Sequence, residues 1–207
     1  MHFSQIVSIA APNYSHPPEA RTCQDQYVGP LSKVMNQHDF PFRKDVDERP
    51  YSPCLILLME SPHKDEFMDV VGPAKGKTGR YIRQHLADVL DCSAHQNSGL
   101  ILLNAIQNQC SLGVATYRYR DKVFREAWTN GGEYDFKRRL KATYMDGDIL
   151  LNCCTKGNDF RYYTSLRDLV ERAIRSNPKN VESVKRLHPS NWWNPARRSQ
   201  EWWPIAS

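Results

Sequence analysis

Short apolar runs alternate with amphipathic stretches through the central and C-terminal parts of the chain. Four runs have the length and composition of buried strands, over residues 54–59, 99–103, 148–153 and 181–187. Between and after them, apolar side chains recur at helical spacing over 79–90, 121–128, 133–144 and 165–176. Strands that alternate with helices pair in parallel through right-handed crossovers. The pattern therefore predicts a three-layer α/β/α sandwich around a central, mainly parallel four-stranded sheet.

The two ends of the chain have a different composition. Residues 1–50 are rich in Pro, Asn, Asp and His and carry one amphipathic stretch, which predicts a helix over about 24–37 and a cap on the fold. Residues 196–207 form a tail rich in Trp and Arg. A length of 207 residues suits one α/β domain, so we expect residues 1–207 to form a single domain.

Polar side chains follow three of the predicted strands at the point where each strand ends. They are Glu60 in Glu-Ser-Pro-His, Asn104 after an apolar run, and His188 in His-Pro-Ser. Ligands of open parallel sheets bind outside the carboxyl ends of the strands. A carboxylate, an amide and an imidazole are therefore expected around one crevice. The alternative for each residue is structural: a glutamate or asparagine that bonds to turn amides, or a packed histidine.

These residue types have suitable chemistry for hydrolysis next to a pyrimidine. Glu60 can orient a water molecule or stabilise a developing cation, with Asp65 and Glu66 as nearby substitutes for that role. The Asn104 amide offers an acceptor and two donors to the edge of a base.

A glycine-rich segment, residues 72–79, precedes the first predicted helix of this part of the chain. It resembles a phosphate-binding loop but has three residues between the first Gly and Gly-Lys-Thr, whereas that loop has four. Nucleotide binding is therefore disfavoured. Free N–H groups at the start of a helix still suit a phosphate, and a DNA backbone could supply it.

The chain is mildly basic, with 28 Lys and Arg against 23 Asp and Glu, a net charge of +5. Arg118, Arg120, Lys122 and Arg125 are interpreted as a solvated helix face. Near the C-terminus, basic residues lie among tryptophans, a combination that nucleic-acid grooves use for stacking. The alternative is that these tryptophans pin the tail to the core (Trp192, Trp193, Arg197, Arg198, Trp202, Trp203).

Several classes of protein are disfavoured. The six cysteines form no CxxC pair, so we expect no metal, no cofactor and no disulfide. No apolar run has the length of a membrane span. The first residues lack the features of a signal peptide, which favours a cytoplasmic protein.

Taken together and in order, the three motifs resemble those of the uracil-DNA glycosylase superfamily over roughly residues 52–195. That superfamily has a Pro-containing water-activating loop after the first strand, an Asn at a strand end and a C-terminal His-Pro-Ser loop. Glu60-Ser61-Pro62 and Gly76-Lys77-Thr78-Gly79 look closest to the iron–sulfur branch. The cysteines of that branch are absent, so no cluster is implied.

The resemblance implies a monofunctional DNA glycosylase that flips out a pyrimidine and hydrolyses its N-glycosidic bond. His188 would hydrogen-bond the departing base, Glu60 would position water, and Asn104 would read the base. Pro62 and His63 would line the base pocket. Contacts with DNA are implied for Gly76, Lys77, Gly79, Ser190, Trp192, Trp193 and Arg197, with Trp192 or Trp193 as a wedge in the base stack.

The sequence departs from the family at the base pocket. Ser61 stands where the founding branch has its catalytic Asp, and Ala74 stands where a Phe stacks on uracil. Losing that ring would leave room for a larger pyrimidine, with Phe67 or His63 stacking instead. Uracil, or glucosylated hydroxymethylcytosine of phage DNA as in some antiphage defence glycosylases, is the expected substrate.

Two other functions remain open. The chain could be an inert nucleic-acid-binding protein with a glycosylase-like fold. A hydrolase that uses Ser61 or Ser190 is the third possibility, although neither serine lies in a G-x-S-x-G elbow.

Overall fold

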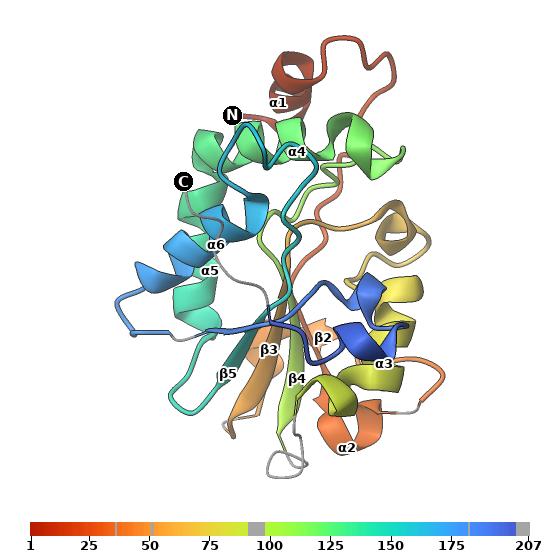
Figure 1. Ribbon diagram of the computed structural model, residues 1–207, viewed down its shortest axis with the longest axis vertical. Helices are drawn as coiled ribbons and strands as arrows, with labels where there is room; N and C mark the ends of the chain where they lie inside the picture. Colours follow the sequence, from red (N-terminus) through yellow and green to blue (C-terminus); the bar gives the residue numbers. More distant parts are fainter. Residues whose placement is uncertain (36, 51, 91–97, 182, 202–207) are drawn as a thin grey trace.

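A mixed six-stranded sheet forms the centre of the protein in a computed structural model that describes residues 1–35, 37–50, 52–90, 98–181 and 183–201 (Figure 1). The strand order is β2-β1-β4-β3-β5-β6. Its strands are β1 (Gln26–Pro30), β2 (Lys44–Asp45), β3 (Cys54–Met59), β4 (Gly99–Asn104), β5 (Ile149–Asn152) and β6 (Ser183–Lys185). The four strands expected from the sequence are present and parallel, and β1 and β2 add an antiparallel edge.

Helices cover both faces of this sheet. They are α1 (Phe3–Ala10), α2 (Leu31–Val34), α3 (Lys77–Val89), α4 (Thr116–Ala127), α5 (Glu133–Thr143) and α6 (Leu166–Arg175). Shorter helical turns are η1 (Val46–Glu48), η2 (Lys64–Phe67), η4 (Trp128–Gly132), η5 (Pro189–Asn191) and η6 (Pro195–Arg197). The four helices predicted after residue 78 are therefore present, with ends that differ by up to five residues.

Alternating side chains of the central strands build two separate cores. In β3, Ile56 and Leu58 face a core shared with α1, α4, α5 and α6. Leu55 and Leu57 face the opposite core, shared with α2 and α3. Figure 1 shows α5 and α6 on one side of the sheet and α2 and α3 on the other. Burial on both faces explains why β3 and β4 are apolar along their whole length.

The helix predicted over residues 24–37 is wrong. Most of its first half is strand β1, and only the four residues of α2 are helical; Asn36 lies outside the described residues. Gly29 has a φ of +120° and Pro30 lacks a backbone N–H, which together exclude a helix there. Residues expected to form a cap thus extend the sheet.

Parallel register brings the strand ends to one edge of the sheet. Met59 pairs with Asn104, and Leu58 pairs with Asn152, so the segments that follow β3, β4 and β5 leave the sheet side by side. His188 follows β6 by three residues. The edge where a ligand was expected therefore carries Glu60 and His188 together.

The expectations about cysteines, metal sites, C-terminal tryptophans and membrane spans concern other parts of the chain. Cys92, Trp202 and Trp203 lie outside the described residues. Within the described part, no group of His, Cys, Asp and Glu side chains could hold a metal ion, and the cysteines are free. Every described helix is too short or too polar to cross a lipid bilayer.

Candidate active site

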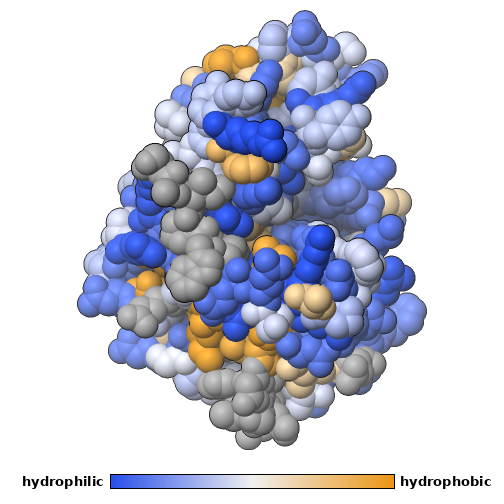
Figure 2. Space-filling view, in the orientation of Figure 1, coloured by the Kyte–Doolittle hydropathy of each residue, from blue (hydrophilic) through white to orange (hydrophobic). Residues whose placement is uncertain are grey.

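A pocket of about 440 Å³ opens at the carboxyl edge of the parallel strands. Its walls come from the segment after β3, the start of α3, the His188 loop, and side chains of α4 and the loops after β4 and β5. Figure 2 shows the surface hollowed between the part that carries α4 and the part that carries α3. Binding sites for small molecules typically enclose about 300–1,000 Å³, so the pocket could hold a single nucleotide's base.

Glu60 lies in the wall of this pocket between a cation and an imidazole. Its Oε1 is 3.5 Å from Nη1 of Arg120, and its Oε2 is 3.8 Å from Nε2 of His188. Arg120 is itself oriented by Asp121, at 2.9 Å. A buried carboxylate needs such a compensating charge. Oε2 is buried and has no hydrogen-bond partner among the described residues, so one oxygen of this carboxylate has an unused acceptor.

His188 is held so that Nε2 faces Glu60. Its Nδ1 accepts a hydrogen bond from the Ser190 backbone N–H at 3.2 Å and lies 2.9 Å from the Ser190 hydroxyl. Because an accepting nitrogen carries no proton, the neutral ring has its proton on Nε2. Burial lowers the pKa of His188. The nearby Glu60 raises this pKa, whereas Arg120 and His63 lower it further. The ring is therefore a neutral donor aimed into the pocket.

Asn104 does not line the pocket. Its side chain is buried behind Glu66, with Nδ2 4.0 Å from Sγ of Cys23. Glu66 does line the pocket and accepts a hydrogen bond from the Cys23 thiol at 3.7 Å. Burial raises the pKa of Glu66 to about 8. Hydrogen bonds from the backbone of His63 and Ala74 and from the side chains of Cys23 and Asn104 act in the opposite direction and lower this pKa. Glu66 therefore faces the pocket on this side, and the Asn104 side chain lies behind it and supports it.

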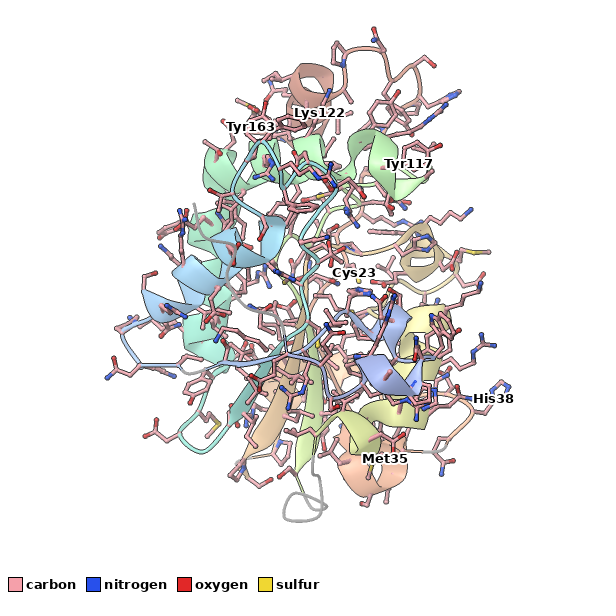
Figure 3. All side chains as sticks on the ribbon, viewed as in Figure 1. Cys23, Met35, His38, Tyr117, Lys122 and Tyr163 are labelled. Carbon is pink, nitrogen blue, oxygen red and sulfur yellow. The ribbon has the colours of Figure 1, made fainter. Side chains whose placement is uncertain are left out.

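Arg139 of α5 fixes the end of β4 from behind. It is ion-paired with Asp25, and its Nη2 donates to the carbonyls of Asn104 and Ala105 at 3.1 and 3.0 Å. Figure 3 shows Cys23, the neighbour of this cluster, near the centre of the molecule. The end of β4, behind the pocket, is therefore held by an ion pair and two hydrogen bonds.

The expected role of Ala74 in the base pocket is wrong, and so is that of Phe67. Both are buried and neither lines the pocket. The carbonyl of Ala74 packs against Gly79 so closely that a Cβ on Gly79 would lie 1.7 Å from it. Gly79 is therefore a packing glycine rather than a contact for DNA. Pro62 and His63 do line the pocket, as expected.

Trp192 cannot act as a wedge, because it is fully buried in the core shared with α3 and donates its Nε1–H to the Leu187 carbonyl at 2.8 Å. Trp192 therefore anchors the segment after His188 to the core, in line with the alternative that the tryptophans pin the tail to the core. Trp193 is exposed and remains available. Ser190 lines the pocket. Arg197 is exposed, and its Nη1 donates a hydrogen bond to Oδ1 of Asn191 at 3.0 Å.

The start of α3 has two different sides. On the pocket side, Gly76 and Lys77 are lining residues, and the Asp65 carboxylate lies so close that a Cβ on Gly76 would be 2.6 Å from it. On the other side, a second hollow of about 460 Å³ is lined by Lys77, Arg80 and Arg83, and by Asp39, which lies 3.8 Å from Nη1 of Arg83. A phosphate is attracted to this cationic side and repelled by Asp65.

Sequence reasoning missed the pocket residues that come from α4 and from the loops around it: Ser111, Thr116, Arg120 and Thr155. Arg120 was interpreted as solvated, yet it is buried against Glu60. The helical period did carry a signal, because Arg120 lies three and four residues before the inward-facing Val123 and Phe124. The loop residues gave no signal, since their neighbours are far away in sequence.

The protein has no match in any of the three comparisons made with it: none of the protein-family models, the curated proteins or the solved structures is similar to this chain. The resemblance to uracil-DNA glycosylases therefore remains a prediction from the three motifs.

Proposed function

We propose that the protein is a DNA glycosylase that hydrolyses the N-glycosidic bond of a modified pyrimidine and leaves an abasic site. The observation that carries the proposal is the pair of Glu60 and His188, which face each other at 3.8 Å across one wall of a pocket at the carboxyl edge of a parallel sheet. A carboxylate with a free oxygen and a neutral imidazole donor are the two groups that this reaction needs.

Base flipping comes first in the proposed mechanism. The enzyme extrudes the nucleotide from the stack, at a cost of a few kcal/mol that contacts in the pocket must offset. Pro62, His63 and the neutral carboxyl of Glu66 line the space in which the base would lie. A protonated Glu66 can both donate and accept a hydrogen bond, so it is suited to read a base edge.

As the bond between sugar and base breaks, negative charge develops on the base and positive charge on the sugar. His188 stabilises the leaving base by donating from Nε2, and the Ser190 backbone fixes that orientation before the reaction begins. Glu60 stabilises the sugar cation and orients the water that attacks it, while Arg120 holds the carboxylate in place. The water supplies the hydroxyl group of the abasic sugar, and its proton balances the released base.

The cationic side of the α3 start supports binding of the DNA backbone. Lys77, Arg80 and Arg83 surround the second hollow, which shares Gly76 and Lys77 with the pocket. Phosphate contacts of this kind position DNA without reading its sequence.

The proposal names the class of the excised base, a modified pyrimidine, and not one particular base. Space left by Ala74 no longer supports a bulky base, because Ala74 is buried in the core. The pocket volume of about 440 Å³ leaves uracil and substituted cytosines, including glucosylated hydroxymethylcytosine of phage DNA, as substrates to test. A role in antiphage defence in the cytoplasm would follow from the latter substrate.

The deciding experiment incubates the protein with oligonucleotides that each carry one modified pyrimidine, in single and double strands. Alkali then converts abasic sites into strand breaks. We expect breaks at one modified base and none at ordinary thymine. Tight binding with no abasic site on any substrate would contradict the proposal and favour an inert nucleic-acid-binding protein. Labelling of Ser61 or Ser190 by a serine-reactive phosphonate would instead favour a serine hydrolase.

A further inference from the structure

Three tyrosines are largely exposed on two segments next to the pocket. Tyr117 is 72% exposed at the start of α4, and Tyr162 and Tyr163 are 84% and 61% exposed in the loop between β5 and α6. Both segments reach the pocket, since Thr116 and Thr155 are among its lining residues. Figure 3 places Tyr117 and Tyr163 at the same end of the molecule, along α4 and far from His38 and Met35.

Partly buried polar contacts hold the two segments together. Arg125 of α4 pairs with both oxygens of Asp159 at 2.6 and 2.9 Å and donates to the Thr164 carbonyl at 2.7 Å. Asp121 of α4 accepts from the backbone N–H groups of Asn158 and Asp159. The exposed tyrosines therefore project from a fixed base rather than from a loose loop.

The rings are presented for contact. Tyr163 lies over the Arg125 guanidinium, with 5.2 Å between Cζ and the ring centroid, so one face of the ring is supported. Tyr117 and Tyr162 make no ring contact with the described residues.

Cations that form no ion pair surround these rings. Arg118 and Lys122 on α4 and Lys156 and Arg161 in the loop form no ion pair with any described residue. Among the acidic side chains of the same two segments, Asp121 and Asp159 are already paired with arginines, which leaves Glu126 near the end of α4 against the four cations. The surface around the tyrosines is therefore positively charged.

We propose that this surface, formed by residues 117–125 and 156–163, is a platform on which unpaired bases of single-stranded DNA stack beside the pocket. The proposal rests on the proposed function, because it names the strand that flanks the flipped nucleotide. Exposed aromatic rings next to cations bind single strands by stacking on bases and by neutralising phosphates. A duplex keeps its bases stacked inside and offers only phosphates to such rings.

The dimensions fit a short stretch of one strand. Arg125, which supports Tyr163, comes eight residues after Tyr117, which is roughly 12 Å along a helix at about 1.5 Å per residue. One strand of stacked duplex DNA advances about 3.4 Å per nucleotide, and an unpaired strand is longer per nucleotide, so the platform spans at most about four nucleotides. It leaves the pocket at Thr116, so a strand can enter the pocket and continue along α4.

The test measures binding to a fluorescein-labelled single strand of thymidine of about 12 nucleotides, by anisotropy, on the full chain. The variant joins Tyr162→Ala to Tyr163→Ala, and we expect at least about tenfold weaker binding. Tyr134→Ala is the matched control, since Tyr134 is 74% exposed on α5 away from the pocket; its affinity should stay within about twofold. Tyr163→Phe should bind as the wild type, because stacking needs the ring and not the hydroxyl.

Wild-type affinity of the folded double variant would overturn the platform. An equal loss of binding to a matched duplex would also overturn it and indicate a duplex contact. The readout uses unmodified DNA and needs no excision. If no substrate is cleaved while the double variant still loses single-strand binding, the proposed catalysis fails and the platform stands.

Discussion

Glu60 and Glu66 lie six residues apart, line the same pocket and are equally buried, with exposed fractions of 5% and 3%. Their surroundings differ. Glu60 lies beside Arg120 and His188, whereas Glu66 has a thiol, an amide and backbone groups as partners, and burial raises its pKa to about 8. Glu60 has a nearby cation and one oxygen without a hydrogen-bond partner among the described residues, whereas Glu66 holds its proton at neutral pH.

The difference separates two tasks within one pocket. A carboxylate that stabilises a cation must be charged, and Glu60 has the cation that makes burial of that charge tolerable. A carboxyl that reads a neutral base works better as a donor and acceptor, which a protonated Glu66 provides. The structure therefore favours Glu60 over Glu66 as the water-orienting group. Asp65 is half-exposed and pairs with His63 at 3.3 Å.

The largest expected effect comes from Glu60→Gln. If Glu60 orients water and stabilises the sugar cation, this change should lower the single-turnover excision rate by about 10²- to 10⁴-fold. The matched control is Glu171→Gln, the same change at a carboxyl equally buried outside the pocket. Equal rates for wild type and Glu60→Gln would remove Glu60 from the mechanism.

His188→Ala should follow, with a loss of about 10²- to 10³-fold, the range for removal of one preorganised donor. The wild-type rate should stay level as the pH falls to the ordinary histidine pKa of 6.5 and decline only below it, because burial lowers the pKa of His188. Protonation then draws the imidazolium and Glu60 together and disables both groups. A rate that already declines above pH 6.5 would contradict a neutral donor.

Glu66→Gln should change stability more than chemistry. The folded protein keeps the Glu66 proton up to about pH 8, while the unfolded chain releases it near pH 4.5. The free energy of unfolding should therefore fall as the pH rises between these values and level off above about 8. Glu66→Gln should remove this dependence, on the order of 1–3 kcal/mol, in urea titrations at pH 5 and pH 8. Identical pH dependence in both proteins would contradict a protonated Glu66.

Cys23→Ala should have the smallest effect. It removes the thiol that donates to Glu66 at 3.7 Å, a hydrogen bond that contributes about 1 kcal/mol. Because that hydrogen bond favours the charged form, its loss should move the pH window of Glu66 slightly upward, as seen in melting temperature against pH. Excision should remain within a few-fold of wild type. A large loss of excision would mean that Cys23 supports the Glu60 side of the pocket as well.

The sequence by itself determined the four parallel strands of the sheet, most of the helices, and the two polar groups at the edge of the sheet. Short apolar runs that alternate with amphipathic helices indicate strands of a parallel sheet, and their ends fix where Glu60 and His188 lie. Pro62, His63 and Ser190 followed because they are close to those ends in the chain, and Lys77 followed from the glycine-rich segment before α3.

Only the tertiary structure decided the rest. The partners of Arg120, Glu66 and Asn104 come from segments remote in sequence, so local patterns say little about their charge or exposure. Long-range packing likewise buried Trp192 and Ala74 and drew residues 26–30 into the sheet as a strand. Burial and charge depend on what lies across a contact, and the chain specifies that only after it has folded.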